Sequence, residues 1–412
     1  MKKTIIAGLV SMLPLLAIAA DHHPQIDPSS SMFGKSRSVV INELQKDIIP
    51  GSAFTAEYAA AMLEIKGKAS ILEAVKHEIQ TIENAVPDFS DFKKRASKQL
   101  PVLKEFDADM YGYVASMAEG LGIAIEDFWV SLYMDAAWTE GAQGLAQALW
   151  GGDEALRNEA IQSTQSRGGC TTAAWTNGIV GGNMDFSSDF LGAQRLVKSD
   201  DLIFEGSYFG AFRSMGKYIG LIINTIALDN AASGADGLPH PIVIASVTKR
   251  ARSVGEAVQM LDSLKSESPM NYTIGDNKGS AIAYNFIKTE DTRVIPATNG
   301  YVVHTNHNLK NRDKLLSVYG NDYNAAAQAT LFTIARYDAA SLLMSIVPKH
   351  ERNVDSMKTI LRTQPINMRS SNEVDFLTTN SYVMDLNKGC LYMTPDRPDL
   401  SSYEVTCFSN ED

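Results

Sequence analysis

The 412-residue sequence contains few cysteines and no excess of basic residues, and both shortages restrict what the chain can do. Its 37 lysines and arginines are outnumbered by 48 aspartates and glutamates, which gives a formal net charge of −11. No lysine- or arginine-rich cluster offsets this charge, and binding to nucleic-acid phosphates needs a basic surface. We therefore expect no nucleic-acid partner.

Long apolar segments are also missing beyond the N-terminus. The most apolar later segment, 218–228, is interrupted by two polar residues and is too short to span a bilayer. At the N-terminus, two lysines precede an apolar run from residue 5 to 20 that contains Pro14 and ends in small side chains. This pattern is typical of a secretory signal peptide, with a membrane anchor as the alternative. We expect residues 1–20 to be a signal peptide and the protein to be exported, periplasmic or secreted, without stable membrane insertion.

The three cysteines predict one disulfide and one free thiol. Oxidising compartments favour cysteine pairing, and Cys390 and Cys407 lie close together, each in a strand-like run. They are the natural pair. Cys170 is then the odd thiol of an exported protein, either a reactive group or a buried inert side chain, and the count alone leaves both readings open.

The first part of the chain is predicted to be helical. Residues from about 55 to 149 form good helix windows, and Met110, Val114, Met117 and Leu121 share one helical face. A polar stretch that ends in Arg167-Gly168-Gly169 has the composition of an exposed linker. With 45% hydrophobic residues, the chain can bury a sizeable core.

From Cys170 onward, strands and helices are predicted in blocks, with no internal repeat. A helix begins at Ser253, where Glu256 completes a capping box. Further helices are predicted at about 324–337, 339–346 and 354–363. β-branched and aromatic runs predict strands at 178–186, 202–209, 218–227, 241–247, 281–287, 292–296, 301–304, 390–393 and 403–408. Separate blocks of strands and helices favour an α+β fold over βαβ alternation.

Four parts of the sequence resemble motifs of a known family and occur in the same order along the chain. Gly-Cys-Thr-Thr at 169–172, with Gly-Asn-Met-Asp-Phe at 182–186, resembles the start of the mature chain in choloylglycine hydrolases (penicillin V and bile salt hydrolases) and penicillin acyltransferases. The segments 271–279 and 304–308 resemble the acyl-coenzyme A:6-aminopenicillanic acid acyltransferase branch, and 111–129 resembles its propeptide. The resemblance extends from about residue 107 to the C-terminus.

The resemblance implies an N-terminal-nucleophile (Ntn) hydrolase with a four-layer αββα sandwich preceded by a helical N-terminal segment. Such precursors cleave themselves before the nucleophile, here between Gly169 and Cys170. Residues 21–169 would be a helical propeptide, or alpha chain, and 170–412 the catalytic beta chain. We expect the two chains to stay associated, since the helical part has apolar faces to bury.

The residues themselves fit this chemistry. No histidine lies near Cys170 in the sequence, but an α-amino group with a pKa near ~8 can accept the thiol proton. Asp185 can hold the resulting ammonium, and Asn306 can donate its amide to an oxyanion. The resemblance places Asn224 and Gly182 on the substrate side. Choloylglycine hydrolases carry an arginine at the position of Gly182 and another in the helix after the asparagine loop.

These observations predict a self-processing cysteine hydrolase that cleaves a linear, non-peptide amide bond of a small N-acyl compound, or transfers the acyl group. Two other classes remain open. One is an exported binding protein with the same fold and a degenerate site, which the apparent lack of arginines favours. The other is a papain-like protease that uses Cys170 with His304 or His307. No cofactor or metal is expected, because histidines three residues apart in a strand point to opposite faces. A homo-oligomer remains open.

Overall fold

The computed structural model describes residues 43–141, 169–186, 190–192, 194–226, 234–286, 293–309, 325–369 and 377–408, with side chains in the helix after residue 325 described from 332. The expected signal peptide, 1–20, lies outside these ranges, as does most of the expected linker before Gly169. Within the described ranges, no helix is long and apolar enough to cross a membrane.

Two β-sheets form the centre of the molecule. The larger has eight strands, in the order β1 (Gln45–Ile48), β4 (Arg195–Lys198), β5 (Leu202–Ser207), β6 (Gly210–Gly216), β7 (Ile219–Thr225), β8 (Met270–Asp276), β9 (Ala281–Phe286) and β10 (Val294–Pro296). The smaller has six, in the order β11 (Tyr301–His304), β2 (Gly169–Trp175), β3 (Ile179–Phe186), β12 (Leu377–Asp385), β13 (Cys390–Met393) and β14 (Glu404–Cys407). Every pairing is antiparallel except that of β1 with β4.

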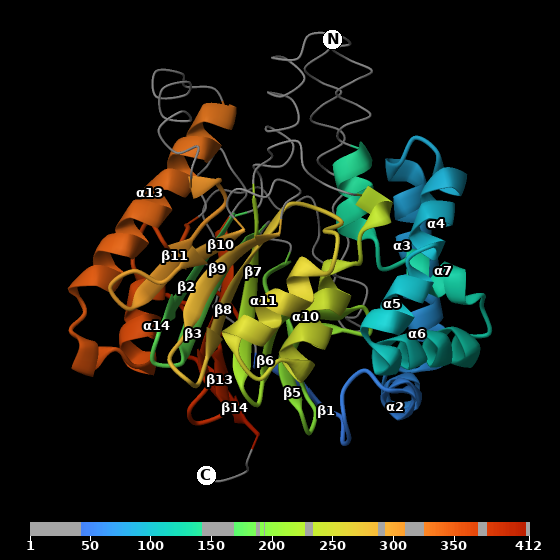
Figure 1. Ribbon diagram of the computed structural model, residues 1–412, viewed down its shortest axis with the longest axis horizontal. Coiled ribbons are helices and arrows are strands. Elements are labelled where there is room, and N and C mark those ends of the chain that lie inside the picture. Colours follow the sequence, from blue (N-terminus) through green and yellow to red (C-terminus); the bar gives the residue numbers. More distant parts are fainter. Residues whose placement is uncertain are drawn as a thin grey trace, which may run out of the picture.

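Helices cover both outer faces of this pair of sheets (Figure 1). The long helix α13 (Ala325–Ile346) and α14 (Val354–Arg362) pack on the smaller sheet, whereas α10 (His240–Arg250) and α11 (Val254–Asp262) pack on the larger. The N-terminal helices lie beyond α10; they are α2 (Ala56–Lys66), α3 (Lys68–Ala85), α4 (Phe89–Ser97), α5 (Leu100–Phe106), α6 (Ala108–Leu121) and α7 (Ile125–Val130). The predicted αββα layering with a helical N-terminal segment is confirmed.

Three apolar clusters hold the layers together. The largest joins the N-terminal helices to α10, α11 and the outer face of the larger sheet. The second fills the space between the sheets, and the third lies under α13 and α14. The four apolar residues predicted to share a helical face, 110, 114, 117 and 121, are all buried in the first cluster. Each such side chain contributes roughly 1.5–3 kcal/mol when it is removed from water.

Three predicted elements differ in the structure. Residues 241–247, predicted as a strand, lie in helix α10, which has Pro239 at its N-cap and Pro241 in its first turn, where proline is tolerated. Residues 240–248 are all buried, so the segment has no polar face. An apolar run without helical periodicity resembles a buried strand. The two helices predicted between 324 and 346 form the single helix α13.

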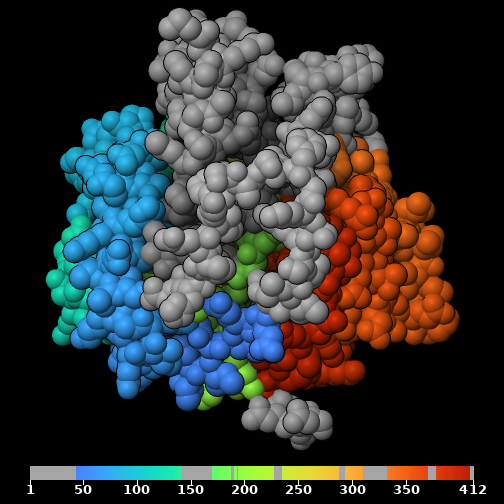
Figure 2. Space-filling view, turned by 180° about the vertical axis from the view of Figure 1, so that it is seen from behind, coloured from blue at the N-terminus to red at the C-terminus, as the bar shows by residue number. Residues whose placement is uncertain are grey.

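Strand β1 was not predicted, and it connects the N-terminal segment to both sheets. It pairs in parallel with β4 at the edge of the larger sheet. The backbone N–H of Leu44 donates to Glu404 Oε1 at 2.7 Å, and Lys46 Nζ lies 2.8 Å from Glu404 Oε2. Figure 2 shows these dark-blue N-terminal residues against the red C-terminal strands. The segment before Cys170 is therefore part of the folded unit.

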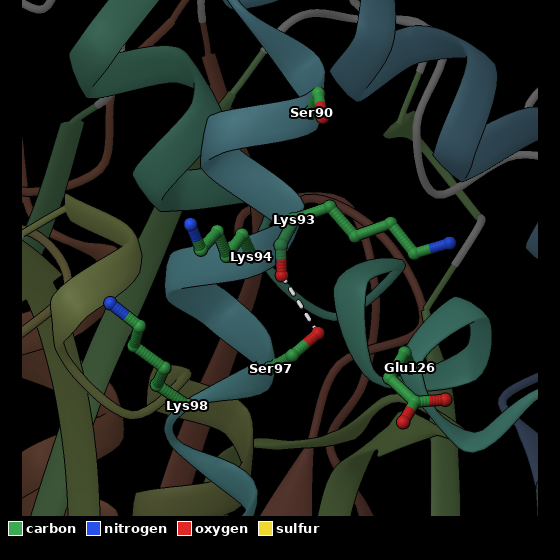
Figure 3. Close-up of a pocket in the computed structure, with 6 residues that line it drawn as sticks. All are labelled: Ser90, Lys93, Lys94, Ser97, Lys98 and Glu126. Atoms are coloured by element: carbon green, nitrogen blue, oxygen red, sulfur yellow. Dashed lines mark hydrogen bonds between the residues drawn. The ribbon is translucent and has the colours of Figure 1, made fainter.

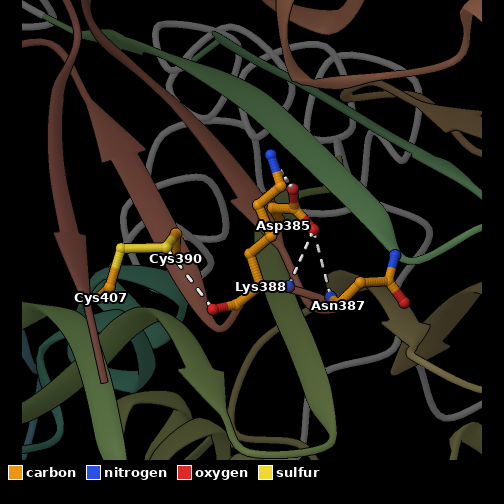
Figure 4. The surroundings of a disulfide bond; sticks show 5 residues. All are labelled: Asp385, Asn387, Lys388, Cys390 and Cys407. Carbon is orange, nitrogen blue, oxygen red and sulfur yellow. Dashed lines mark hydrogen bonds and ion pairs between the residues drawn. A yellow bond between two sulfur atoms is a disulfide. The ribbon is translucent and has the colours of Figure 1, made fainter. Parts of the chain in front are cut away.

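The predicted disulfide is confirmed. Cys390 and Cys407 face each other across β13 and β14 and form the bond (Figure 4). The turn before β13 is held by Asp385, whose Oδ1 accepts from the backbone N–H groups of Asn387 and Lys388, both at 3.2 Å. Cys170 is a free cysteine. This leaves Cys170 available for other chemistry.

Candidate active site

Cys170 is the second residue of β2 and faces the space between the sheets. Side chains alternate along a strand. The hydroxyl of Thr171 meets Arg336 on α13, outside the smaller sheet, whereas the hydroxyl of Thr172 lies 2.7 Å from that of Thr273 on β8. Cys170 therefore points, like Thr172, toward the larger sheet. It is half-buried.

Arg336 joins the three predicted catalytic residues into one cluster. Its Nη1 donates to the carbonyl oxygen of Cys170 at 2.7 Å and lies 3.3 Å from Asp185 Oδ2. Its Nη2 donates to Asn306 Oδ1 at 2.8 Å, and the same oxygen accepts the backbone N–H of Cys170 at 2.9 Å. The structure thus brings Cys170, Asp185 and Asn306 together around a buried guanidinium that sequence reasoning did not place there.

Asp185 is fully buried on β3, directly opposite Gly169 on β2. Its Oδ1 accepts from the Thr378 hydroxyl at 2.6 Å, while its Oδ2 accepts no hydrogen bond. Burial raises the pKa of Asp185 to about 6, even though Arg336 and Thr378 favour the charged form. Oδ2 of Asp185 is ion-paired with Arg336 but accepts no hydrogen bond, so a carboxylate beside the Gly169–Cys170 bond can still accept a hydrogen bond from a cation formed there.

Asn306 is oriented differently from the prediction. Its Nδ2 donates to the backbone oxygen of Thr225 at 2.9 Å and to the Thr225 hydroxyl at 3.1 Å. The Thr333 hydroxyl holds its backbone N–H at 2.8 Å. The oxygen of Asn306, and not the amide nitrogen expected to stabilise an oxyanion, therefore faces the nitrogen of Cys170.

The two residues expected on the substrate side lie in the protein interior. Asn224 Oδ1 accepts from the Thr172 hydroxyl at 3.0 Å and from Asn271 Nδ2 at 2.9 Å, and Asn224 Nδ2 lies 3.0 Å from His304 Nδ1. A Cβ on Gly182 would lie 2.7 Å from the backbone oxygen of Thr171. These contacts give Asn224 and Gly182 a role in packing the sheets against each other.

The histidines of the papain-like alternative are engaged elsewhere. His304 is buried beside Asn224, and burial lowers its pKa to about 3. The Nδ1 of His307 lies 3.2 Å from the Thr305 hydroxyl. Neither contact involves Cys170, so the geometry does not favour a cysteine–histidine pair. Among the described residues, no group of three or more histidine, cysteine, aspartate or glutamate side chains could hold a metal ion.

A second arginine reaches the site from the larger sheet. Arg213 on β6 is buried, and its Nη1 lies 2.6 Å from Glu205 Oε2 on β5. Burial raises the pKa of the Cys170 thiol, and among the charges that act on the thiol Arg213 opposes this rise most. The sequence predicted a site without arginines, but the structure places Arg336 and Arg213 there. This removes the observation that favoured a degenerate site. No sequence motif marks Arg213, because only the packing of the two sheets brings it to the site.

A surface pocket of about 460 Å³ lies apart from this cluster (Figure 3). It is lined by residues of α4 and the start of α7: Ser90, Lys93, Lys94, Ser97, Lys98 and Glu126. Lys93 is paired with Asp127. The pocket shares no residue with the Cys170 cluster, and surface lysines alone do not define a site.

The chain was compared with curated proteins, with solved structures and with protein-family models. The search of curated proteins found no match. Similar solved structures include an N-acylethanolamine-hydrolyzing acid amidase ortholog from Caenorhabditis elegans, with 16% identity over 53% of this chain and 92% of that chain and a TM-score of 0.37. They also include a mutant conjugated bile acid hydrolase from Clostridium perfringens, with 13% identity over 59% and 97% and a TM-score of 0.37. A penicillin V acylase from Agrobacterium tumefaciens has 12% identity over 55% and 82% and a TM-score of 0.33.

The family match is the stronger finding. Residues 176–399, more than half of the chain, match the acyl-coenzyme A:6-aminopenicillanic acid acyl-transferase family. The matched range contains Asp185, Asn306 and Arg336. It begins shortly after Cys170, in the turn between β2 and β3. The chain therefore belongs to the acyl-coenzyme A:6-aminopenicillanic acid acyl-transferase family, whose members are amidohydrolases or acyltransferases of the Ntn-hydrolase type.

Proposed function

We propose that the chain is an exported precursor that cleaves its own Gly169–Cys170 bond and then uses Cys170 to break a linear, non-peptide amide bond. The observation that carries this proposal is the set of polar groups around the main chain of Cys170. Its N–H donates to Asn306 Oδ1 at 2.9 Å, and on the paired strand Asp185 Oδ2 accepts no hydrogen bond and is ion-paired with Arg336. A peptide N–H needs one acceptor, whereas an ammonium group has three hydrogens to donate. The surroundings suit the N-terminal amine that cleavage would create.

The proposed self-cleavage uses the thiol of Cys170, the residue that follows this bond. The Cys170 sulfur attacks the carbonyl carbon of Gly169, the C–N bond breaks, and the nitrogen of Cys170 takes the proton that the thiol gives up. The product is a thioester, and water opens it to a Gly169 carboxylate and a free thiol. Glycine suits residue 169, because a Cβ there would lie 2.8 Å from Asp185 Oδ2 and 3.2 Å from Arg336 Nη2.

Turnover uses the amine that cleavage releases. The α-amine takes the thiol proton, and the resulting thiolate attacks the carbonyl carbon of the substrate amide. The ammonium then protonates the leaving amine, which departs and leaves an acyl-thioester on Cys170. Water, or a second amine, attacks this thioester and releases the acyl group. Asp185 and the oxygen of Asn306 hold the ammonium between these steps.

The family and the apolar surroundings of Cys170 support a substrate class. The name of the matched family describes transfer of an acyl group to an amine. Met184 lies opposite Cys170 on β3 and belongs to the apolar cluster between the sheets, with Leu196, Ile203 and Met215. An apolar neighbour of the nucleophile, such as Met184, suits an apolar acyl group. We therefore expect small N-acyl compounds to be better substrates than unblocked peptides.

Export rests on two further features. Residues 1–20 have the pattern of a signal peptide, and Cys390 and Cys407 form a disulfide, which persists in oxidising compartments such as the periplasm. Fractionation of cells that make the full chain would test the location. A protein confined to the cytoplasm with its first 20 residues attached would contradict this part of the proposal.

The deciding experiment is intact mass and N-terminal sequencing of protein made with its own leader. We expect two chains, the second beginning at Cys170. Cys170→Ala should give one uncut chain without activity, and Ser345→Ala, an exposed change on α13, should be cut normally. The purified protein is then assayed on N-acyl amides and on peptides. Activity from a chain with residue 170 still joined to Gly169, or turnover of peptides alone, would refute the proposal.

A further inference from the structure

Near Cys170, two neighbouring residues of the larger sheet pack against two neighbouring residues of the smaller sheet. On the larger sheet, Arg213 and Ile222 are direct neighbours on β6 and β7. On the smaller sheet, Tyr382 and Gly182 are direct neighbours on β12 and β3. The guanidinium carbon of Arg213 lies 4.8 Å from the centre of the Tyr382 ring, and Ile222 Cγ2 lies 3.3 Å from where a Cβ on Gly182 would be. Arg213 therefore crosses the gap and reaches the smaller sheet.

The partner of Arg213 contacts the row that carries the nucleophile. Cys170 pairs with Met184, and Met184 pairs with Asn380 on β12, so these three residues form one row across the smaller sheet. Asn380 Nδ2 donates to Glu205 Oε1 at 3.3 Å, while Glu205 Oε2 lies 2.6 Å from Arg213 Nη1. The Glu205–Arg213 pair thus lies over the strands that position Cys170.

The hydrogen-bonding capacity of Arg213 is incompletely used. Its Nε is buried and has no hydrogen-bond partner, and Glu205 is its one ion-pair partner among the described residues. A buried cation is costly, and replacing such a pair with apolar residues is often neutral or stabilising. Stability alone therefore does not account for a charged pair at this position.

The other charges around Cys170 largely oppose each other. Asp185 raises the thiol pKa and Arg336 lowers it, and the two form an ion pair with each other. His304, on the neighbouring strand β11, is kept neutral by burial. Arg213 is therefore the charge with the largest effect on the thiol, and it acts against the rise that burial causes.

We propose that Arg213 is a positioning residue for the nucleophile. Arg213 stabilises the thiolate of Cys170 from the opposite sheet, and Glu205 partly offsets the positive charge of Arg213. Position 182 on β3 is a glycine in this chain and carries no charge. The cation that acts on the thiol is instead Arg213, on β6. This inference deepens the proposed function and rests on Cys170 being the nucleophile.

The test measures the ionisation of the Cys170 thiol directly. Cys170 is the one free cysteine, so the ultraviolet absorbance of thiolate as a function of pH reports on it whether or not the chain is cleaved. We expect Arg213→Met to lower the thiolate fraction at neutral pH by about tenfold, which corresponds to one pKa unit. Glu205→Gln should raise it several-fold, because Arg213 loses its counter-charge. Arg213→Lys should keep most of the effect.

Two controls separate charge from folding. Arg213→Met/Glu205→Gln leaves no unpaired buried charge, so it should fold even if Arg213→Met does not, and it should still lower the thiolate fraction. Arg95→Met breaks an arginine–glutamate pair in the helical segment, with Glu140, and should leave the thiol unchanged. Equal thiol titration in all these variants, or shifts of the same sign in Arg213→Met and Glu205→Gln, would overturn the inference. Failure of the Gly169–Cys170 cleavage would instead count against the proposed function.

Discussion

Gly169 lies directly opposite Asp185 on the paired strands β2 and β3, and a Cβ at residue 169 would lie 2.8 Å from Asp185 Oδ2. The bond proposed to break and the carboxylate proposed to hold its product are therefore in contact before any cleavage. The same Cβ would lie 3.2 Å from Arg336 Nη2. Residue 169 must therefore be small if the cluster around Cys170 is to keep its geometry.

Gly169→Ala is expected to slow self-cleavage strongly and to cost about 1–3 kcal/mol of folding free energy, because the added methyl group overpacks a closed cluster. Cleavage is followed by gel and mass, and stability by urea unfolding. Gly255→Ala is the matched control, since a Cβ there would have only Ser253 Oγ nearby, at 3.9 Å. In helix α11 it should be neutral or stabilising. Normal cleavage of Gly169→Ala would mean that this contact does not shape the reaction.

Arg336→Leu is expected to abolish cleavage and to destabilise the fold by roughly 3–5 kcal/mol, because it leaves the buried Asp185 without its cation. The carbonyl of Cys170 and the oxygen of Asn306 each lose a donor as well. Arg336→Lys should retain part of the stability but little activity, since one ammonium cannot reproduce the forked contacts. Urea unfolding and cleavage rates are compared with Ser345→Ala on the same helix. A stable, fully active Arg336→Leu would exclude the proposed role.

The sequence alone could place those site residues that lie close to one another along the chain. Cys170 and Asp185 lie on neighbouring strands joined by the turn at 177–178, where Gly178 has φ +86, so a short hairpin brings them together. Arg336 is 166 residues from Cys170, and only the packing of α13 on the smaller sheet places it there. A sequence also does not show which end of the Asn306 amide faces the nucleophile, because Thr225 and Thr333 determine that orientation.

In the fold as well, elements with local sequence signals could be predicted. Elements with clear local signals were predicted within a few residues, such as the capped helix at Ser253 and the strand Tyr301–His304. The strand β1 depends on a parallel partner about 150 residues away and has no apolar alternation of its own. Residues 240–248 of helix α10 are all buried, so the segment lacks the separate apolar and polar faces that identify a surface helix in a sequence. Strand β1 and helix α10 were missed because distant contacts set their form, and strands β4, β6, β8 and β12 were not predicted either.

Turnover by the cleaved enzyme is expected to fall as the pH is lowered through about 6, where Asp185 takes up a proton. Above that pH the carboxylate is charged and attracts the ammonium of Cys170, and below it the attraction is lost. The effect of pH on the stability of the fold has the opposite sign. A carboxyl with a pKa raised above its unfolded value of about 4 favours the folded state below that value and loses this contribution as the pH rises to 6.

Activity should therefore disappear on the acid side without unfolding. Rate profiles and circular dichroism over the same pH range test this expectation. Asp185→Asn should give a low rate with no acid limb near 6, since it cannot titrate. An acid limb that remains in Asp185→Asn would assign the titration to another group.

Alkylation of the native protein without reductant is expected to label Cys170 alone, because Cys390 and Cys407 are bonded to each other. Replacing both of the bonded cysteines with alanine should cost about 3 kcal/mol in a loop of this length and leave the labelling of Cys170 unchanged. Peptide mapping locates the label, and urea unfolding measures the loss. Label on Cys390 or Cys407 in the unreduced protein would contradict the pairing.

After cleavage, the helical chain is expected to stay bound to the catalytic chain. The Tyr113 hydroxyl donates to the backbone oxygen of Tyr208 at 2.6 Å, and Glu140 Oε1 accepts the backbone N–H of Ala235 at 3.0 Å. Strand β1 also completes the edge of the larger sheet. These contacts and the shared apolar cluster should keep both chains together on size exclusion until denaturant is added.

A pair of substitutions on α6 tests this interface. Val114→Asp places a carboxylate among buried apolar side chains, at a cost of several kcal/mol, and should release the helical chain or prevent folding. Glu119→Ala, on the exposed side of the same helix, should leave both chains together. If the cleaved wild-type chains separate in native buffer, residues before 170 serve only as a removable propeptide. In that case, the strand that β1 adds to the larger sheet would not be needed for the activity of the mature enzyme.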